Sequence, residues 1–147
     1  MAKRLNRKFV SKLVADSRVF KDEMSKMIKE KVEDSKKLML NEFDRHPVTV
    51  EIKGGVNSSN LSKTLPGGYG NLYTFIGFRY GTTPVFPVRN LLSLTNVMKR
   101  TRTQVTGTKI TTYFKVSTPS EEQITTVSKM PWERGRSWVY GIERGIS

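Results

Sequence analysis

The chain has 147 residues, of which 36% are hydrophobic and 27% charged, a composition that suits one domain with a packed core. It has no apolar run near the roughly 18 residues that a membrane-spanning helix needs. It contains no cysteine, which excludes disulfides, zinc–thiolate sites and cysteine nucleophiles. The basic first residues are followed by a polar-interrupted stretch rather than a secretory apolar segment. We therefore expect a single domain over residues 1–147, made in a cytoplasm and without a membrane segment.

The formal net charge of +13 requires a negatively charged partner or an acidic neighbouring subunit. The positive charge is concentrated in the middle of the chain, because no Asp or Glu occurs from Ile52 to Ser120. Nine cations fall in that acid-free stretch, which should present a positive face: Lys53, Lys63, Arg79, Arg89, Lys99, Arg100, Arg102, Lys109 and Lys115.

Residues 1–45 predict one long N-terminal helix. Neither Gly nor Pro precedes Pro47, and apolar residues recur at steps of three, four or seven. A helix this long exceeds what one small domain can cover, so part of it should pack against another copy or another protein. Two shorter helices with a kink near Asp34–Ser35 are the alternative. A heptad-like seam would make the contact, formed by Val10, Leu13, Ser17, Phe20, Met24 and Met27.

Residues 46–129 predict a sheet region that begins after Pro47, since a proline disfavours the helical conformation of the residue before it. Alternating apolar and polar residues predict a strand over 48–52, and an aromatic-rich run predicts another over 71–78. The Gly-, Ser- and Asn-rich segment 54–70 predicts a long docking loop, because its composition buries too little apolar surface to hold itself in place.

The rest of the sheet region predicts a helix over 85–94 and a hairpin. The hairpin strands are the Thr-rich runs 96–104 and 109–117, joined through 105–108. A further helix should start near Ser120, where two acidic residues follow. The predicted fold class is α+β, with a long N-terminal helix, a small and mainly antiparallel sheet, and short helices including one at the C-terminus.

Residues 130–147 contain both tryptophans of the chain, together with Arg residues and glycines. This composition is typical of an aromatic anchor that docks on another surface. The alternative is a last amphipathic helix that closes its own domain. Trp138, Ile142 and Ile146 share one helical face at steps of four. The expected interface residues of the anchor and of loop 54–70 are Leu61, Leu65, Tyr69, Trp132, Arg136, Trp138 and Ile142.

Catalytic, metal and cofactor sites are not indicated by the sequence. His46 is the only histidine, and no acidic residue lies in the stretch that follows Glu51. The glycines of 66–70 lack the Gly-Lys-Ser/Thr ending of a phosphate-binding loop and precede a predicted strand. Nothing brings the carboxylates of Glu121–Glu122 or of Glu133 and Glu143 into one cleft. We expect a protein that is not an enzyme and binds no cofactor.

Nucleic-acid binding is the alternative function that the sequence supports. Basic residues interleave with Tyr113 and Phe114 along the predicted hairpin, as on sheet surfaces that bind nucleic acid. No base-reading motif is present, and a basic ribbon can equally meet an acidic protein. The basic face would consist of Lys99, Arg100, Arg102, Lys109 and Lys115.

Three segments together resemble small virion proteins of contractile-tailed bacteriophages: HPVTVEI at 46–52, LPGGYGNLYTFIGF at 65–78 and GRSWVYGIERGIS at 135–147. A long helix before a small sheet is also similar to the neck and tail-completion (head–tail joining) proteins of tailed phages. The resemblance implies a structural subunit of a virion, assembled in the host cytoplasm into a ring, commonly of six copies. It leaves open a tail terminator, a connector or stopper, and a baseplate component.

The implied partners are further copies of the chain and neighbouring connector, tail-tube or sheath proteins, with non-specific contact to packaged DNA also open. The hairpin matches no pattern of these proteins, so the resemblance assigns no role to its residues.

Overall fold

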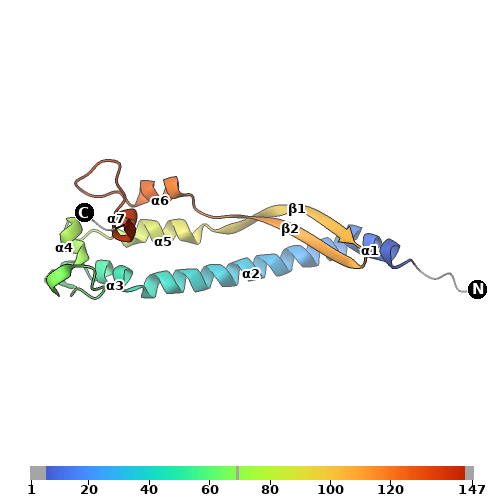
Figure 1. Cartoon of the computed structure of the whole chain (residues 1–147), viewed down its shortest axis with the longest axis horizontal. Helices are drawn as coiled ribbons and strands as arrows, with labels where there is room; N and C mark the ends of the chain where they lie inside the picture. The colour runs from blue at the N-terminus through green and yellow to red at the C-terminus, as the bar shows by residue number, and fades with distance from the viewer. Residues whose placement is uncertain (1–5, 69, 145–147) are drawn as a thin grey trace, which may run out of the picture. The chain divides into compact units, whose positions relative to one another are not determined.

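The computed structural model describes residues 6–68 and 70–144, and the chain divides into two compact units (Figure 1). Unit 1 comprises Met1–Ser35 and Asn96–Ser117, and unit 2 comprises Lys36–Thr95 and Thr118–Ser147. The sequence had suggested one domain with a single sheet region. The predicted α+β class is confirmed, because the described chain combines helices with one two-stranded antiparallel sheet.

The N-terminal region forms a short helix α1 (Arg7–Asp16) and a long helix α2 (Arg18–Arg45), so the predicted long N-terminal helix is confirmed over residues 18–45 but is interrupted at Ser17. Ser17 separates them. Its backbone is extended, at φ −65° and ψ 140°, and its hydroxyl oxygen accepts a hydrogen bond from the backbone N–H of Phe20. Serine favours this capping geometry at a helix start. The alternative kink near Asp34–Ser35 is wrong, since α2 continues through both residues and ends, as expected, before Pro47.

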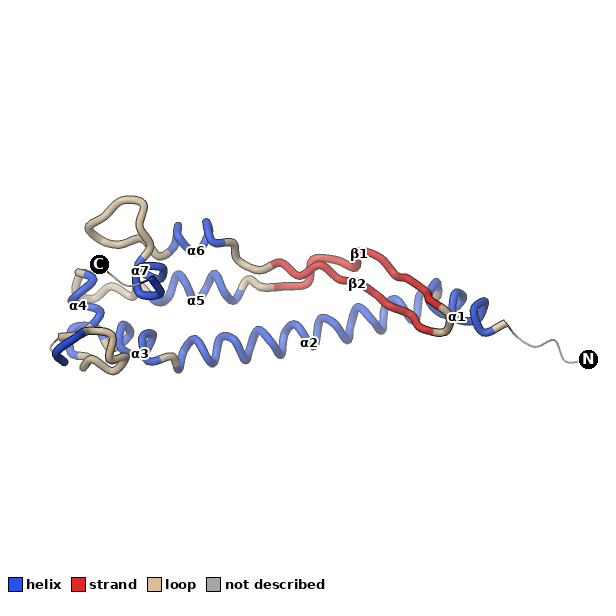
Figure 2. Tube along the Cα trace, viewed as in Figure 1, coloured by secondary structure: helices blue, strands red, loops and turns tan. Residues whose placement is uncertain are grey.

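Unit 1 contains the predicted hairpin, which is confirmed as β1 (Asn96–Thr106) and β2 (Lys109–Ser117). The strands pair in antiparallel register down to Thr106 and Lys109, and Gly107 makes the turn at φ +63°. Helix α1 contacts both strands and buries Ala15. Figure 2 shows the paired strands in red extending to α1. The hairpin and the first helix thus form a small helix-on-ribbon layer.

Unit 2 is helical, and its elements after α2 are α3 (Pro47–Lys53), α4 (Leu72–Ile76), α5 (Val85–Ser93), α6 (Glu121–Val127) and α7 (Trp138–Arg144), with short 3-10 turns at Gly55–Asn57 and Pro66–Gly68. The predicted helix 85–94, the helix after Ser120 and the C-terminal helix are confirmed. Ser120 caps α6 reciprocally with Gln123, each side chain bonding the other's backbone N–H.

The two predicted strands of this region, 48–52 and 71–78, are wrong, because both are helices. Pro47 occupies the first turn of α3, where its missing N–H costs nothing. The helix buries Thr49, Glu51 and Ile52 and leaves Val50 40% exposed, whereas a strand would have placed Val50 with its apolar neighbours. Helix α4 starts at Asn71, whose side chain accepts from the N–H of Thr74, and ends at Gly77 in the left-handed conformation.

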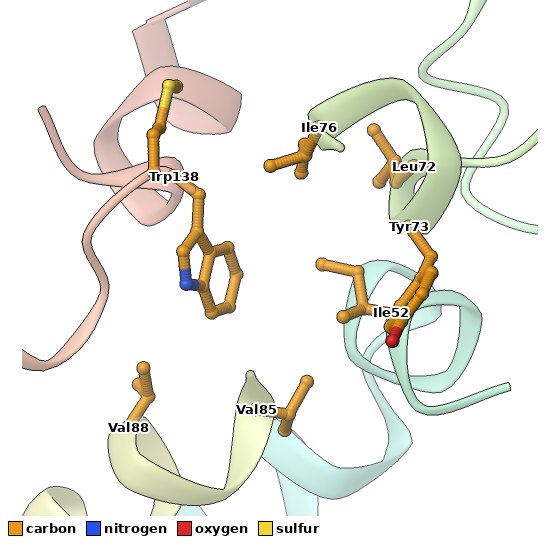
Figure 3. Close-up of a cluster of buried hydrophobic side chains, with 8 residues drawn as sticks. Ile52, Leu72, Tyr73, Ile76, Val85, Val88 and Trp138 are labelled. Carbon is orange, nitrogen blue, oxygen red and sulfur yellow. The ribbon is translucent and has the colours of Figure 1, made fainter. Parts of the chain in front are cut away.

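The core of unit 2 is assembled largely from the short helices α3, α4, α5 and α7, which contribute one to three buried side chains each (Figure 3). Trp138 of α7 points between Ile76 of α4 and Val88 of α5. Its ring meets Phe78 edge-on at 6.0 Å between ring centroids, a favoured aromatic geometry. The buried residues of this cluster are Ile52, Leu72, Tyr73, Ile76, Val85, Val88, Met130 and Trp138.

Glu51 fastens the loop 54–70 to this core. Its side chain is fully buried, and its two carboxylate oxygens accept hydrogen bonds of 2.7 Å from the backbone N–H groups of Ser62 and Leu72. Asn71 adds a second tie by donating from Nδ2 to the carbonyls of Val56 and Ser58. The prediction that loop 54–70 cannot hold itself in place is therefore wrong. Hydrogen bonds to polar side chains fix the loop, although it has little apolar surface to bury.

A second carboxylate, Asp44 near the end of α2, holds α5 within the same unit. Both of its oxygens accept from Nε of Arg89, at 2.9 and 2.8 Å, and Nζ of Lys53 lies 3.9 Å away. Two cations of the acid-free stretch are thus compensated by an acid that precedes it in sequence. The other basic residues of that stretch include the five on the hairpin.

We predict that Glu51→Gln lowers the free energy of unfolding by about 2–4 kcal/mol, because the amide NH2 that replaces one carboxylate oxygen cannot accept a hydrogen bond and one buried backbone N–H loses its partner. Chemical denaturation measures the loss, and hydrogen exchange should accelerate at the amides of Ser62 and Leu72. Glu30→Gln, on the exposed surface of α2, is the matched control and should change stability by less than about 0.5 kcal/mol. Equal stability of the two variants would contradict the role of Glu51.

Candidate interaction surfaces

The hairpin has two faces, and the pairing register assigns each residue to one of them. Strand β2 alternates regularly, while β1 has irregularities between Val97 and Lys99 and between Arg100 and Arg102. Directly paired residues share a face. The outer face therefore consists of Lys99, Arg102, Gln104, Thr106, Lys109, Thr111, Tyr113 and Lys115, and the inner face of Arg100, Thr103, Val105, Ile110, Thr112 and Phe114.

The β1 irregularities decide where the charges lie. Lys99 and Arg102 are three residues apart, so a regular strand would place them on opposite faces. The extra residue between them restores them to one face, as a bulge does. The outer face thereby gathers four of the five predicted basic residues, all exposed: Lys99, Arg102, Lys109 and Lys115.

The predicted basic residue Arg100 does not belong with the other four. It pairs with Phe114 on the inner face, and its Nη1 is buried with no hydrogen-bond partner among the described residues. Helix α1 covers this inner face, as Ala15, Thr103 and Val105 line one cavity. The assignment of Arg100 to the basic face is therefore corrected, because the register turns its side chain to the covered side.

Two contacts characterise the outer face electrostatically. Lys99 lies directly opposite Lys115, a pairing of like charges that destabilises a hairpin. The guanidinium carbon of Arg102 lies 4.4 Å from the centroid of the Tyr113 ring, which is 39% exposed. This stacking holds one cation in place by a cation–π attraction. Neither strand contains an Asp or Glu that could offset these charges.

Helix α1 presents an uncovered apolar face. Phe9, Val10, Leu13 and Val14 are 58%, 38%, 56% and 41% exposed. These positions lie on one side of a helix, away from Ala15, which is buried. Of the predicted seam, Phe20 and Met24 on α2 are half-buried, while Met27 on α2 is 49% exposed, as Val10 and Leu13 on α1 are exposed. A face of this kind on the surface of a protein marks an interaction site.

The C-terminal aromatic segment is divided between core and surface. Trp138 is 4% exposed, and Ile142 and Leu65 pack against the same core. The expectation that Trp138 anchors a neighbouring subunit is corrected, since its ring fills the interior of its own unit, as the domain-closing alternative requires. Leu61 is half exposed, while Tyr69 and Ile146 lie outside the described residues.

The other two predicted anchor residues lie on a loop closed by pairing of Lys129 with Ser137. Trp132 is 61% exposed, and its Nε1 donates to the carbonyl of Ile76. Arg136 was expected to pair with an acidic neighbour, but its Nε lies 3.4 Å from a carboxylate oxygen of Glu133 in its own chain.

An apolar groove of about 510 Å³ in unit 2 lies between α2, α3, α5 and α7. Phe43, Leu92 and Ile142 are among its lining residues, and His46 lies at its edge with Glu42 and Glu143. Sequence reasoning did not find this groove, because its residues come from four separate helices. Only the predicted interface residues Trp138 and Ile142 pointed to it.

No group of three or more His, Asp or Glu residues in the described part of the chain could hold a metal ion. Glu121 forms an exposed ion pair with Arg144 at 3.5 Å. Burial raises the pKa of the Tyr140 hydroxyl, and the carboxylates of Glu121 and Glu143 add to the effect while Arg144 opposes it. Tyr140 therefore stays protonated at neutral pH.

Comparisons of the chain with protein families, curated proteins and solved structures find no match. None of the described helices is long and apolar enough to cross a membrane.

We predict that Trp138→Ala lowers the free energy of unfolding by about 3–5 kcal/mol, because it removes a large ring from a packed core and leaves a cavity. Trp132→Ala is the matched control. It should cost about 1 kcal/mol, the typical value of the one hydrogen bond that its mostly exposed ring makes. Denaturant titration of both variants measures the difference. If Trp138→Ala left stability unchanged and impaired assembly alone, the anchor interpretation would return.

Proposed function

We propose that the protein is a non-catalytic structural subunit that assembles with further copies of itself, as a ring-forming neck, connector or tail-completion protein of a phage virion. The observation that carries this proposal is the exposed apolar face of α1, formed by Phe9, Val10, Leu13 and Val14. Burying apolar surface contributes about 25 cal/mol per Å², so covering this face would stabilise an assembly.

A second copy is the occupant that the charges favour. Helix α1 carries Arg7, Lys8 and Lys12 beside its apolar residues. Helix α2 carries five acids and three lysines between Asp22 and Asp34, so this stretch has a small negative balance within a helix of mixed charge. The basic residues of α1 in one copy can therefore pair with acids of α2 in another, which favours a head-to-tail contact between identical subunits. Such contacts close into rings when the rotation between subunits permits.

The phage assignment is supported by the sequence resemblance of segments 46–52, 65–78 and 135–147. In the structure these segments all belong to unit 2, where they build α3, α4 and α7 around the core. The three resembling segments therefore belong to one packed unit and are not scattered over the chain. Neighbouring connector, tail-tube or sheath proteins are the further partners under this proposal, and the virion is the location.

We predict that Phe9→Ser combined with Leu13→Ser weakens self-association by at least about thirtyfold, which corresponds to roughly 2 kcal/mol of interface energy. Both side chains are already more than half exposed in the single chain, so the subunit should keep its stability. Sedimentation equilibrium or light scattering measures the change, and thermal unfolding checks the fold.

Leu38→Ser is the matched control, since Leu38 is a 59% exposed leucine on α2. It should leave the assembly intact if the face of α1 makes the contact. A wild-type chain that stays monomeric at high concentration would overturn the proposal. Equal weakening by the α1 variant and the control would show that the contact lies elsewhere.

A further inference from the structure

We infer that the outer face of the hairpin binds the phosphate backbone of duplex DNA without reading its sequence. The proposal concerns Lys99, Arg102, Lys109 and Lys115 with the exposed ring of Tyr113. It does not depend on self-association, because all these residues lie on one hairpin of a single chain.

Two cations of this face repel each other, and a bound anion would relieve that repulsion. Lys99 and Lys115 are direct cross-strand partners, and both are exposed. Like charges at that position disfavour the hairpin. A phosphate between them would convert the repulsion into two charge-assisted contacts.

Besides its cations, the face carries hydroxyl and amide groups of the kinds that contact nucleic-acid backbones. Arg102 is held over the Tyr113 ring at 4.4 Å, so its planar donors are already oriented. Thr106, Thr111 and Gln104 share this face and supply hydroxyl and amide donors. Side chains of these types make many of the phosphate contacts in protein–DNA complexes.

The outer face is long enough to contact several phosphates, and the carboxylate of Asp16 on α1 lies on the other side of the hairpin. From Lys115 to Lys109 the strand rises about 20 Å, a length of duplex that carries about twelve phosphates. Asp16 of α1 lines the cavity with Thr103 and Val105 on the inner face. That carboxylate therefore lies on the side of the hairpin away from the four cations.

The sequence contains no recognisable base-reading motif, so contacts to phosphates should supply the binding energy. Four cations on a ribbon can neutralise about four phosphates, which gives a slope near −3.5 for the logarithm of affinity against the logarithm of salt concentration. DNA is favoured over an acidic protein because its dense charge releases condensed counterions when it is bound. Binding should therefore be equal for unrelated duplex sequences.

The test compares Lys99→Gln/Lys115→Gln with Lys26→Gln/Lys29→Gln in the full chain, using fluorescence anisotropy with a 30-base-pair duplex. Both variants lose two positive charges, but Lys26 and Lys29 lie on α2 among acidic residues. The hairpin variant should bind about tenfold more weakly near 0.1 M salt, with a slope smaller by about 2. The α2 variant should bind nearly as wild type does.

Misfolding cannot account for this result, because removing the Lys99–Lys115 repulsion should leave the melting temperature unchanged or raised. Polyglutamate at equal charge concentration should compete at least tenfold less well than unlabelled duplex. No binding of duplex at low salt, equal losses in the two variants, a strong preference for one sequence, or equal competition by polyglutamate would each overturn the inference.

Discussion

Unit 2 depends on one buried carboxylate. Glu51 projects from a helix of seven residues and holds the backbone N–H groups of Ser62 and Leu72. A buried charge is tolerated only when hydrogen bonds replace the water it has lost, and here both oxygens receive a donor. The interaction fixes the backbone of Ser62 and of Leu72 to α3. The loop 54–70 and the start of α4 therefore acquire defined positions.

This arrangement explains how a glycine-rich loop and very short helices can surround a common core. Helices of five to nine residues have little stability of their own, and α4 has only five. Three of them are secured by a polar side-chain contact: Asn71 begins α4, Ser120 begins α6, and Asp44 holds α5 through Arg89. The core then needs only one to three buried side chains from each of α3, α4, α5 and α7, with Trp138 filling the centre.

The sequence predicted those elements whose signals are local. The hairpin, α5, the capped start of α6 and the helix end before Pro47 each follow from a few adjacent residues. The strands predicted at 48–52 and 71–78 failed for different reasons. At 48–52 the alternation of Val48, Val50 and Ile52 fits a strand, and only the tertiary burial of Thr49 and Glu51 favours a helix. At 71–78 the signals were present, since Asn71 and Gly77 are good helix caps, but the aromatic run suggested a strand.

Of the candidate surfaces, the sequence identified the basic residues but could not assign them to a face. Successive residues of a strand point to opposite faces of the sheet, and one unpaired bulge residue in β1 shifts this alternation by one position. Composition alone would count Arg100 with Arg102, yet the structure turns the first toward Phe114 on the covered side and stacks the second on the exposed Tyr113.

The exposed apolar face of α1 has a related origin. A heptad-like pattern predicts that the apolar residues on one side of a helix are buried, but it does not predict which partner covers them. The break at Ser17 separates the stripe into a half-covered portion on α2 and an open one on α1. Unit 1 therefore carries an apolar face on its helix and a cationic face on its hairpin. Since the inner face of the hairpin packs against α1 while the cations lie on the outer face, an apolar contact and an anionic one need not compete for the same residues.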